Sequence, residues 1–85
     1  MTLAGWSKTV VVQIRPRSGF IPVSNTRTAF DLLISLWPVT SGKAFWAAQE
    51  ICLAAMDRRV PHEDARLAFI AAAKEASVTG HQQDW

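Results

Sequence analysis

The charged residues of the segment 43–57 recur at a single spacing, which limits how this part of the chain can fold. Lys43, Glu50 and Asp57 are each seven residues apart, which is almost two turns of an α-helix. A helix over about residues 42–58 would therefore carry its charges in one narrow stripe, with mostly apolar side chains elsewhere. We expect this helix to be central in the fold and nearly enclosed.

Two large apolar side chains, Trp46 and Leu53, fall within or beside the charged stripe. They are also seven residues apart, so they lie along one edge of the helix. Large apolar groups on the side that faces water need a cover. A second copy of the chain would cover them, and so would the C-terminal tail or the residues around Trp6. Trp46 and Leu53 are therefore the candidate interaction surface.

The N-terminal part of the chain has the pattern of a β-hairpin. Over residues 8–14 the pattern places Val10, Val12 and Ile14 on one face and Thr9 and Gln13 on the other, and β-branched residues favour strands. The segment RPRSG at 15–19 breaks this pattern, and FIPVS at 20–24 resumes it. Pro22 cannot donate a hydrogen bond to a sheet, so the second strand is predicted to be an edge strand.

Two further helices are predicted on either side of the central segment. Apolar residues recur at helical spacing over 29–36, and Pro38 disfavours helical backbone at Trp37, so the first helix should end there. Pro61 suits the first turn of a third helix. The apolar stripe of that helix comprises Ala65, Phe69, Ala72, Ala73 and Ala76. The predicted fold class is α+β, with an N-terminal β-hairpin packed on three α-helices.

The chain has the size of one domain. We assign residues 1–85 to a single small domain with an ordered core over about 6–78 and a flexible tail at 79–85. Hydrophobic residues make up 49% of the chain, and much of the excess is alanine, which fills little volume. A core this thin gains from a partner surface.

The sequence favours a soluble protein of the cytoplasm. No stretch approaches the roughly 18 apolar residues that span a bilayer, and the N-terminus lacks the pattern of a signal peptide. Cys52 is the only cysteine, which excludes an intramolecular disulfide and suits a reducing compartment. Its neighbours at helical spacing are apolar, which favours an inert buried thiol over a nucleophile.

Positive charge is concentrated in the N-terminal half. The net charge is +2 in total, but residues 1–45 carry +4 and the remainder −2. Arg15 and Arg17 in the hairpin turn, with Arg27, are candidate contacts for a phosphate or a nucleic-acid backbone. The alternative is a solvated turn, because dedicated nucleic-acid binders have a larger basic surface.

The residues needed for catalysis or metal binding do not occur together. His62 and His81 lack the spacing of a metal site, and none of the four glycines belongs to a phosphate-binding loop. We expect Arg66 to pair with Asp57 or Glu50 rather than to bind a ligand. The chain is therefore not expected to be an enzyme or to carry a cofactor or metal.

Several short patterns in the C-terminal two thirds resemble a bacterial family of unknown function, domain-of-unknown-function family 982. They are LWP at 36–38, Gly42, Phe45, Ala48, Cys52–Leu53 and ARLAFIAAAKEA at 65–76. The resemblance covers roughly residues 6–78. The chain departs from the family at Phe45, where tyrosine is common, and in its hairpin loop, Arg15–Gly19. The resemblance implies a small α+β fold and no particular activity.

Together these features favour a non-enzymatic interaction module that forms a homodimer or binds another protein. The two strands leave unpaired edges and gain from packing on helices or on a second chain. The alternative is a regulator that binds nucleic acid or phosphate through the basic hairpin turn.

Overall fold

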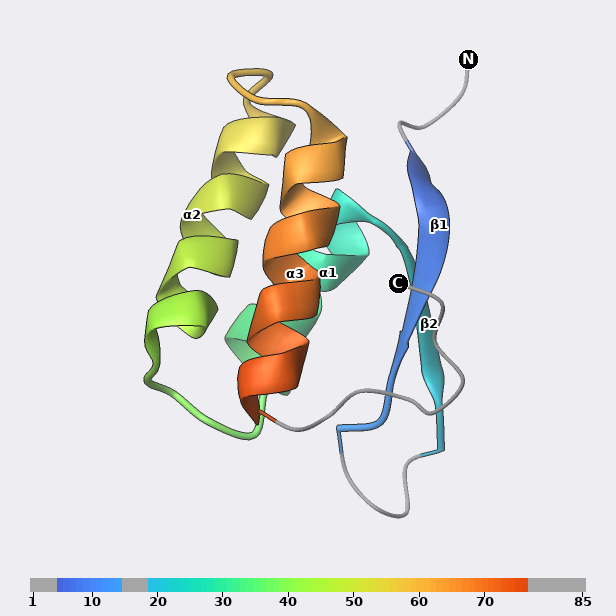
Figure 1. Ribbon diagram of the computed structural model, residues 1–85, viewed down its shortest axis with the longest axis vertical. Helices are drawn as coiled ribbons and strands as arrows, with labels where there is room; N and C mark the ends of the chain where they lie inside the picture. The colour runs from blue at the N-terminus through green and yellow to red at the C-terminus, as the bar shows by residue number, and fades with distance from the viewer. Residues whose placement is uncertain (1–4, 15–18, 77–85) are drawn as a thin grey trace.

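A computed structural model describes residues 5–14 and 19–76 of the chain (Figure 1). Strands β1 (Gly5–Val12) and β2 (Ile21–Asn25) form an antiparallel sheet. Helices α1 (Thr26–Ser35), α2 (Lys43–Met56) and α3 (His62–Ala76) follow. This confirms the predicted α+β fold with an N-terminal hairpin and three helices. The predicted tail at 79–85 lies outside the described residues.

The sheet buries one face, as the alternation in its sequence predicts. Val10 pairs with Val23 and Val12 with Ile21, and the three valines are fully buried. The register shifts between Gly5 and Val10, so β1 is irregular in its first half. An antiparallel sheet can leave one face in water, so the helices need to cover only the face that carries these valines.

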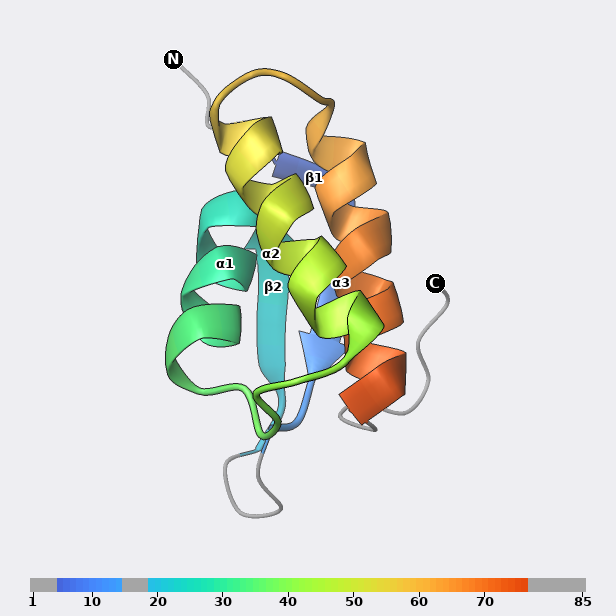
Figure 2. The same ribbon diagram turned by 90° about the vertical axis from the view of Figure 1, so that its left-hand side faces the viewer.

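The helices lie in two layers over this sheet. α3 packs against β1 and α1 against β2, while α2 packs on α1 and α3 on the side away from the strands (Figures 1 and 2). None of the described helices is both long and apolar enough to cross a membrane.

α2 is an outer helix, so the expectation that it is central and nearly enclosed is wrong. Its buried residues are confined to one stripe: Phe45, Ala48, Cys52 and Ala55. The physical reason is that the sheet is narrow. It has two strands, and α1 and α3 already cover its buried face. The helix α2 has only the groove between those two helices to pack into.

Phe69 occupies the centre of the core. Its ring centroid lies 5.6 Å from that of Trp6 on β1 and 5.3 Å from that of Trp37, which follows α1. Both contacts are tilted, an arrangement that aromatic pairs prefer to a face-to-face stack. Trp6 is therefore buried against Phe69, and it is committed to the core rather than to the outer face of α2.

α1 begins and ends through local hydrogen bonds. The side chain of Asn25 accepts a hydrogen bond from the Thr28 amide at 2.8 Å, which makes Asn25 the N-cap. The helix ends at Ser35, and the Leu36 amide donates to the Leu32 carbonyl. It therefore stops slightly before the predicted end at Trp37.

The start of α2 is capped by a residue from the end of α3. The Glu75 carboxylate accepts hydrogen bonds from the amides of Ala44, at 3.0 Å, and Phe45, at 3.1 Å. These amides belong to the first turn, which has no partners within the helix. Gly42 lies directly beside this carboxylate and has a φ of 126°, which L side chains rarely adopt. A glycine is required there both for the backbone conformation and for the space.

We predict that Gly42→Ala lowers the free energy of unfolding by about 1–3 kcal/mol, because the methyl group would meet the Glu75 carboxylate on a strained backbone. Denaturant unfolding measures this change. Gly5→Ala is the matched control, since its Cβ would make only an ordinary 3.6 Å contact with the Ser24 carbonyl. Equal stability of the two variants would contradict the role assigned to Gly42.

Candidate functional site

The outer face of α2 exposes large apolar side chains. Trp46 and Leu53 are 55% and 48% exposed, so both predicted residues face outward. Ile34 of α1 is 56% exposed, and Val39, in the connection between α1 and α2, is also exposed. We call Ile34, Val39, Trp46 and Leu53 the α2 outer surface.

Two hollows lie along this surface. Trp46 lines the first, of about 320 Å³, together with Ile34, Val39 and Gln49. The Trp46 ring packs edge-on against Phe45, with centroids 5.3 Å apart, and this contact helps to hold its orientation. Leu53 lines a second, more open hollow with Met56, Asp57 and Arg59. The α2 outer surface is therefore uneven, with Trp46 beside one hollow and Leu53 beside the other.

Sequence reasoning missed two members of the α2 outer surface, Ile34 and Val39. Ile34 lies off the buried stripe of α1, and that displacement was the available signal for its exposure. Val39 carried no helical or strand pattern of its own. Only the packing of α1 on α2 brings these two residues beside Trp46.

The basic candidates are not assembled into a site within the described residues. Arg15 and Arg17 lie outside them. Arg27 is exposed and its Nε atom lies 3.4 Å from Asp31 Oδ1, one turn along the same helix. Such pairs belong to a solvated helix face. The nucleic-acid alternative gains no support from Arg27.

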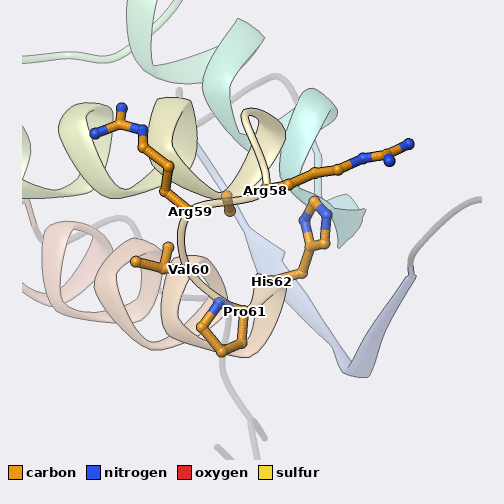
Figure 3. Close-up of a pocket in the computed structure, with 6 residues that line it drawn as sticks. Arg58, Arg59, Val60, Pro61 and His62 are labelled. Atoms are coloured by element: carbon orange, nitrogen blue, oxygen red, sulfur yellow. The ribbon is translucent and has the colours of Figure 1, made fainter.

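A further hollow at the turn between α2 and α3 is lined by Arg58, Arg59 and His62 (Figure 3). The two guanidinium groups point in opposite directions there, away from the hollow. Arg59 donates a hydrogen bond from Nε to Asp57 at 3.1 Å. Convergent donors are what an anion site requires. These residues are therefore not arranged to hold a phosphate.

His62 belongs to a hydrogen-bonded chain that joins three elements. The buried Thr26 hydroxyl of α1 accepts a hydrogen bond from Trp6 Nε1 of β1 at 3.0 Å. The same oxygen lies 2.7 Å from His62 Nδ1, at the first residue of α3. With neutral His62 protonated at Nε2, the hydroxyl donates to Nδ1 and both its functions are used. This arrangement gives His62 a structural role.

Arg66 is buried, and it pairs with Glu63 rather than with Asp57 or Glu50, so that expectation is wrong. Its Nε donates to Glu63 Oε2 at 2.7 Å, while Ser7 Oγ donates to Oε1 at 2.9 Å. The hydrogen bond from Arg66, and then that from Ser7, lower the pKa of the Glu63 carboxyl. Glu63 lies one turn away on the same helix, which places it nearer than any residue of α2.

Cys52 is fully buried, as its neighbours predicted. Burial raises the pKa of its thiol from 9.0 to about 12, because a thiolate would be poorly solvated there. Within the part of the chain that the structure describes, no group of three or more His, Cys, Asp or Glu side chains is placed to hold a metal ion.

A family model described as a protein of unknown function (DUF982) matches residues 8–79. The chain belongs to this family. The match covers the hairpin from Lys8 onward and all three helices, and it confirms the family suggested by the sequence patterns. No curated protein and no solved structure matches the chain. Membership of DUF982 assigns no activity to the chain.

We predict that a thiol reagent modifies native Cys52 slowly, because only about one thiol in ten thousand is ionised at pH 8 when the pKa is about 12. Unfolded protein should react at the rate of a free cysteine, and comparing the two rates checks the prediction. Cys52→Ser should cost about 1–3 kcal/mol, since it buries a hydroxyl among apolar groups.

The raised pKa of Cys52 also fixes the sign of a pH effect. The unfolded chain loses the thiol proton near pH 9 and the folded chain near pH 12, so the contribution of this group to stability is complete below pH 9 and declines above it. Cys52→Ala lacks this contribution and serves as the control. A stability that declines equally in both proteins above pH 9 would contradict the assignment.

We predict that Thr26→Val costs about 1–3 kcal/mol, because it leaves the buried Trp6 indole N–H without its acceptor. Thermal or denaturant unfolding measures the loss. Thr28→Val, on the same helix but only partly buried, should change stability much less. Similar losses in the two variants would mean that helix propensity, rather than the Thr26 hydroxyl, matters.

Proposed function

We propose that this DUF982 domain is a small, non-enzymatic interaction module of the cytoplasm that self-associates through the α2 outer surface. The observation that carries the proposal is the half-exposure of Trp46 and Leu53 on one edge of α2. Exposed apolar residues scattered singly are ordinary, but here Ile34 and Val39 extend the surface beside Trp46. Tryptophan is also enriched among residues that dominate interface energies.

Burial of the α2 outer surface against a second chain would contribute a favourable free energy of association. Removing apolar surface from water yields about 25 cal/mol per Å², and aromatic side chains such as Trp46 bury large areas. One intramolecular cover suggested by the sequence, the region around Trp6, is already used in the core. A second copy of the chain is present wherever the protein is, and it could bury Trp46 and Leu53, which favours self-association.

The chemistry of the described polar groups supports a non-enzymatic role. The Cys52 thiol stays protonated, and His62 and Glu63 have partners within the fold. The Cys52 side chain packs in the core, and the side chains of His62 and Glu63 form hydrogen bonds that join elements of the fold. A buried free thiol also suits the reducing conditions of the cytoplasm.

Light scattering coupled to size exclusion tests the proposal. At tens of micromolar we expect about twice the 9.4 kDa mass of one chain. Combining Trp46→Ala with Leu53→Ser should shift the protein toward monomer, because it removes most of the apolar contact. Leu67→Ser is the matched control, since Leu67 on α3 is 54% exposed and lies outside the α2 outer surface.

A native mass of one chain at that concentration would contradict self-association. The proposal would also be contradicted if Leu67→Ser dissociated the protein as strongly as the double variant does, because the contact would then lie on α3. Circular dichroism of each variant establishes that it is folded before its mass is interpreted.

A further inference from the structure

The charges of α2 are arranged against its own dipole. Lys43, a cation, is the first residue of the helix, and Asp57, an anion, is its C-cap. A helix favours anions near its N-terminus and cations near its C-terminus. Glu75 and Arg59 offset this arrangement from within the chain. The exposed stripe itself begins with the cation Lys43 and ends with the anion Asp57, which Arg59 partly neutralises.

A second copy of α2 fits this stripe only when it runs in the opposite direction. A parallel copy would place Lys43 beside Lys43 and Asp57 beside Asp57. An antiparallel copy, related by a two-fold axis, places Lys43 of each chain beside Asp57 of the other. Among the described residues Lys43 has no ion-pair partner, so its ammonium group is available for such a contact. Asp57 already pairs with Arg59 through Oδ2, so Lys43 of the second copy would share the Asp57 carboxylate with Arg59.

The apolar residues select the same register. Lys43 and Asp57 are centred on position 50, while Trp46 and Leu53 are centred between Gln49 and Glu50, half a residue away. The alignment that joins the charges therefore also places Trp46 of one copy over Leu53 of the other. The hollow beside Trp46, with Ile34 and Val39 on its walls, is positioned to receive that leucine.

We propose that two copies pair through antiparallel α2 helices, with Leu53 of each entering the hollow beside Trp46 of the other and Lys43–Asp57 contacts at both ends. This inference rests on the proposed self-association and specifies its geometry. It has one unfavourable consequence: Glu50 lies close to Glu50 of the second copy, beside the two-fold axis. The two carboxylates repel each other and weaken the pair.

Charge reversal tests the register. Asp57→Lys and Lys43→Glu should each weaken dimerisation about tenfold by sedimentation equilibrium at low salt, because the contact is lost twice per dimer. Both changes agree with the helix dipole, but Asp57→Lys also removes the pair with Arg59, and Lys43→Glu adds a second carboxylate to the turn that Glu75 caps. Circular dichroism of each variant therefore establishes that it is folded before its affinity is interpreted. Combining the two should restore most of the affinity. A double variant as weak as the singles would overturn the antiparallel pairing.

Glu50→Gln gives a second, opposite test. It removes the repulsion across the axis, so the dimer should become several-fold tighter, whereas a change at an isolated surface site would leave affinity unchanged. A weaker or unaltered dimer would place Glu50 away from the axis and contradict the proposed register.

Disulfide trapping separates the geometry from self-association itself. Gln49→Cys, next to the axis, should form a covalent dimer on mild oxidation, while Lys43→Cys, at one end of the helix, should not. Buried Cys52 stays out of the reaction. A parallel pair would instead cross-link both positions. If the wild-type chain is dimeric but Gln49→Cys does not cross-link, the antiparallel geometry is wrong and the proposed self-association stands. A monomeric wild-type chain would contradict both the geometry and the self-association.

Discussion

The fold depends on the contact of Phe69 with two tryptophans. Phe69 projects from α3, Trp6 from the first strand and Trp37 from the connection after α1, so one ring links three separate parts of the chain. The flanking alanines of α3 let the neighbouring elements approach closely. A small domain has few large side chains to bury, and here the aromatic residues supply the volume that alanine cannot. The positions of the strands and of α1 follow from this contact.

The sequence predicted features that are determined by neighbouring residues. The alternation of Val10 and Val12 indicated the buried face of β1, and Pro38 and Pro61 marked the interruptions between helices. The burial of Cys52 followed from its helical neighbours. Each of these depends on a periodicity or a backbone restriction within a few residues, and such signals are present in the sequence before any tertiary contact forms.

Features that depend on distant residues were not predictable in this way. The scarcity of charge in α2 suggested an enclosed helix, but a sheet of two strands leaves no room for a third helix against it. The partner of Arg66 and the cap supplied by Glu75 both depend on how α3 is placed. In the candidate site, Trp46 and Leu53 could be identified from the stripe of one helix, whereas Ile34 and Val39 join them only through packing between helices.

The cap on α2 has a consequence for the order of folding during synthesis. Glu75 is 31 residues from Ala44 and 30 from Phe45, whose amides it binds. As the chain emerges, α2 is complete in sequence well before this carboxylate exists, and its first turn is then open to water. The first turn of α2 is therefore capped by a residue near the end of α3, so a chain that stops before Glu75 leaves that turn without its cap.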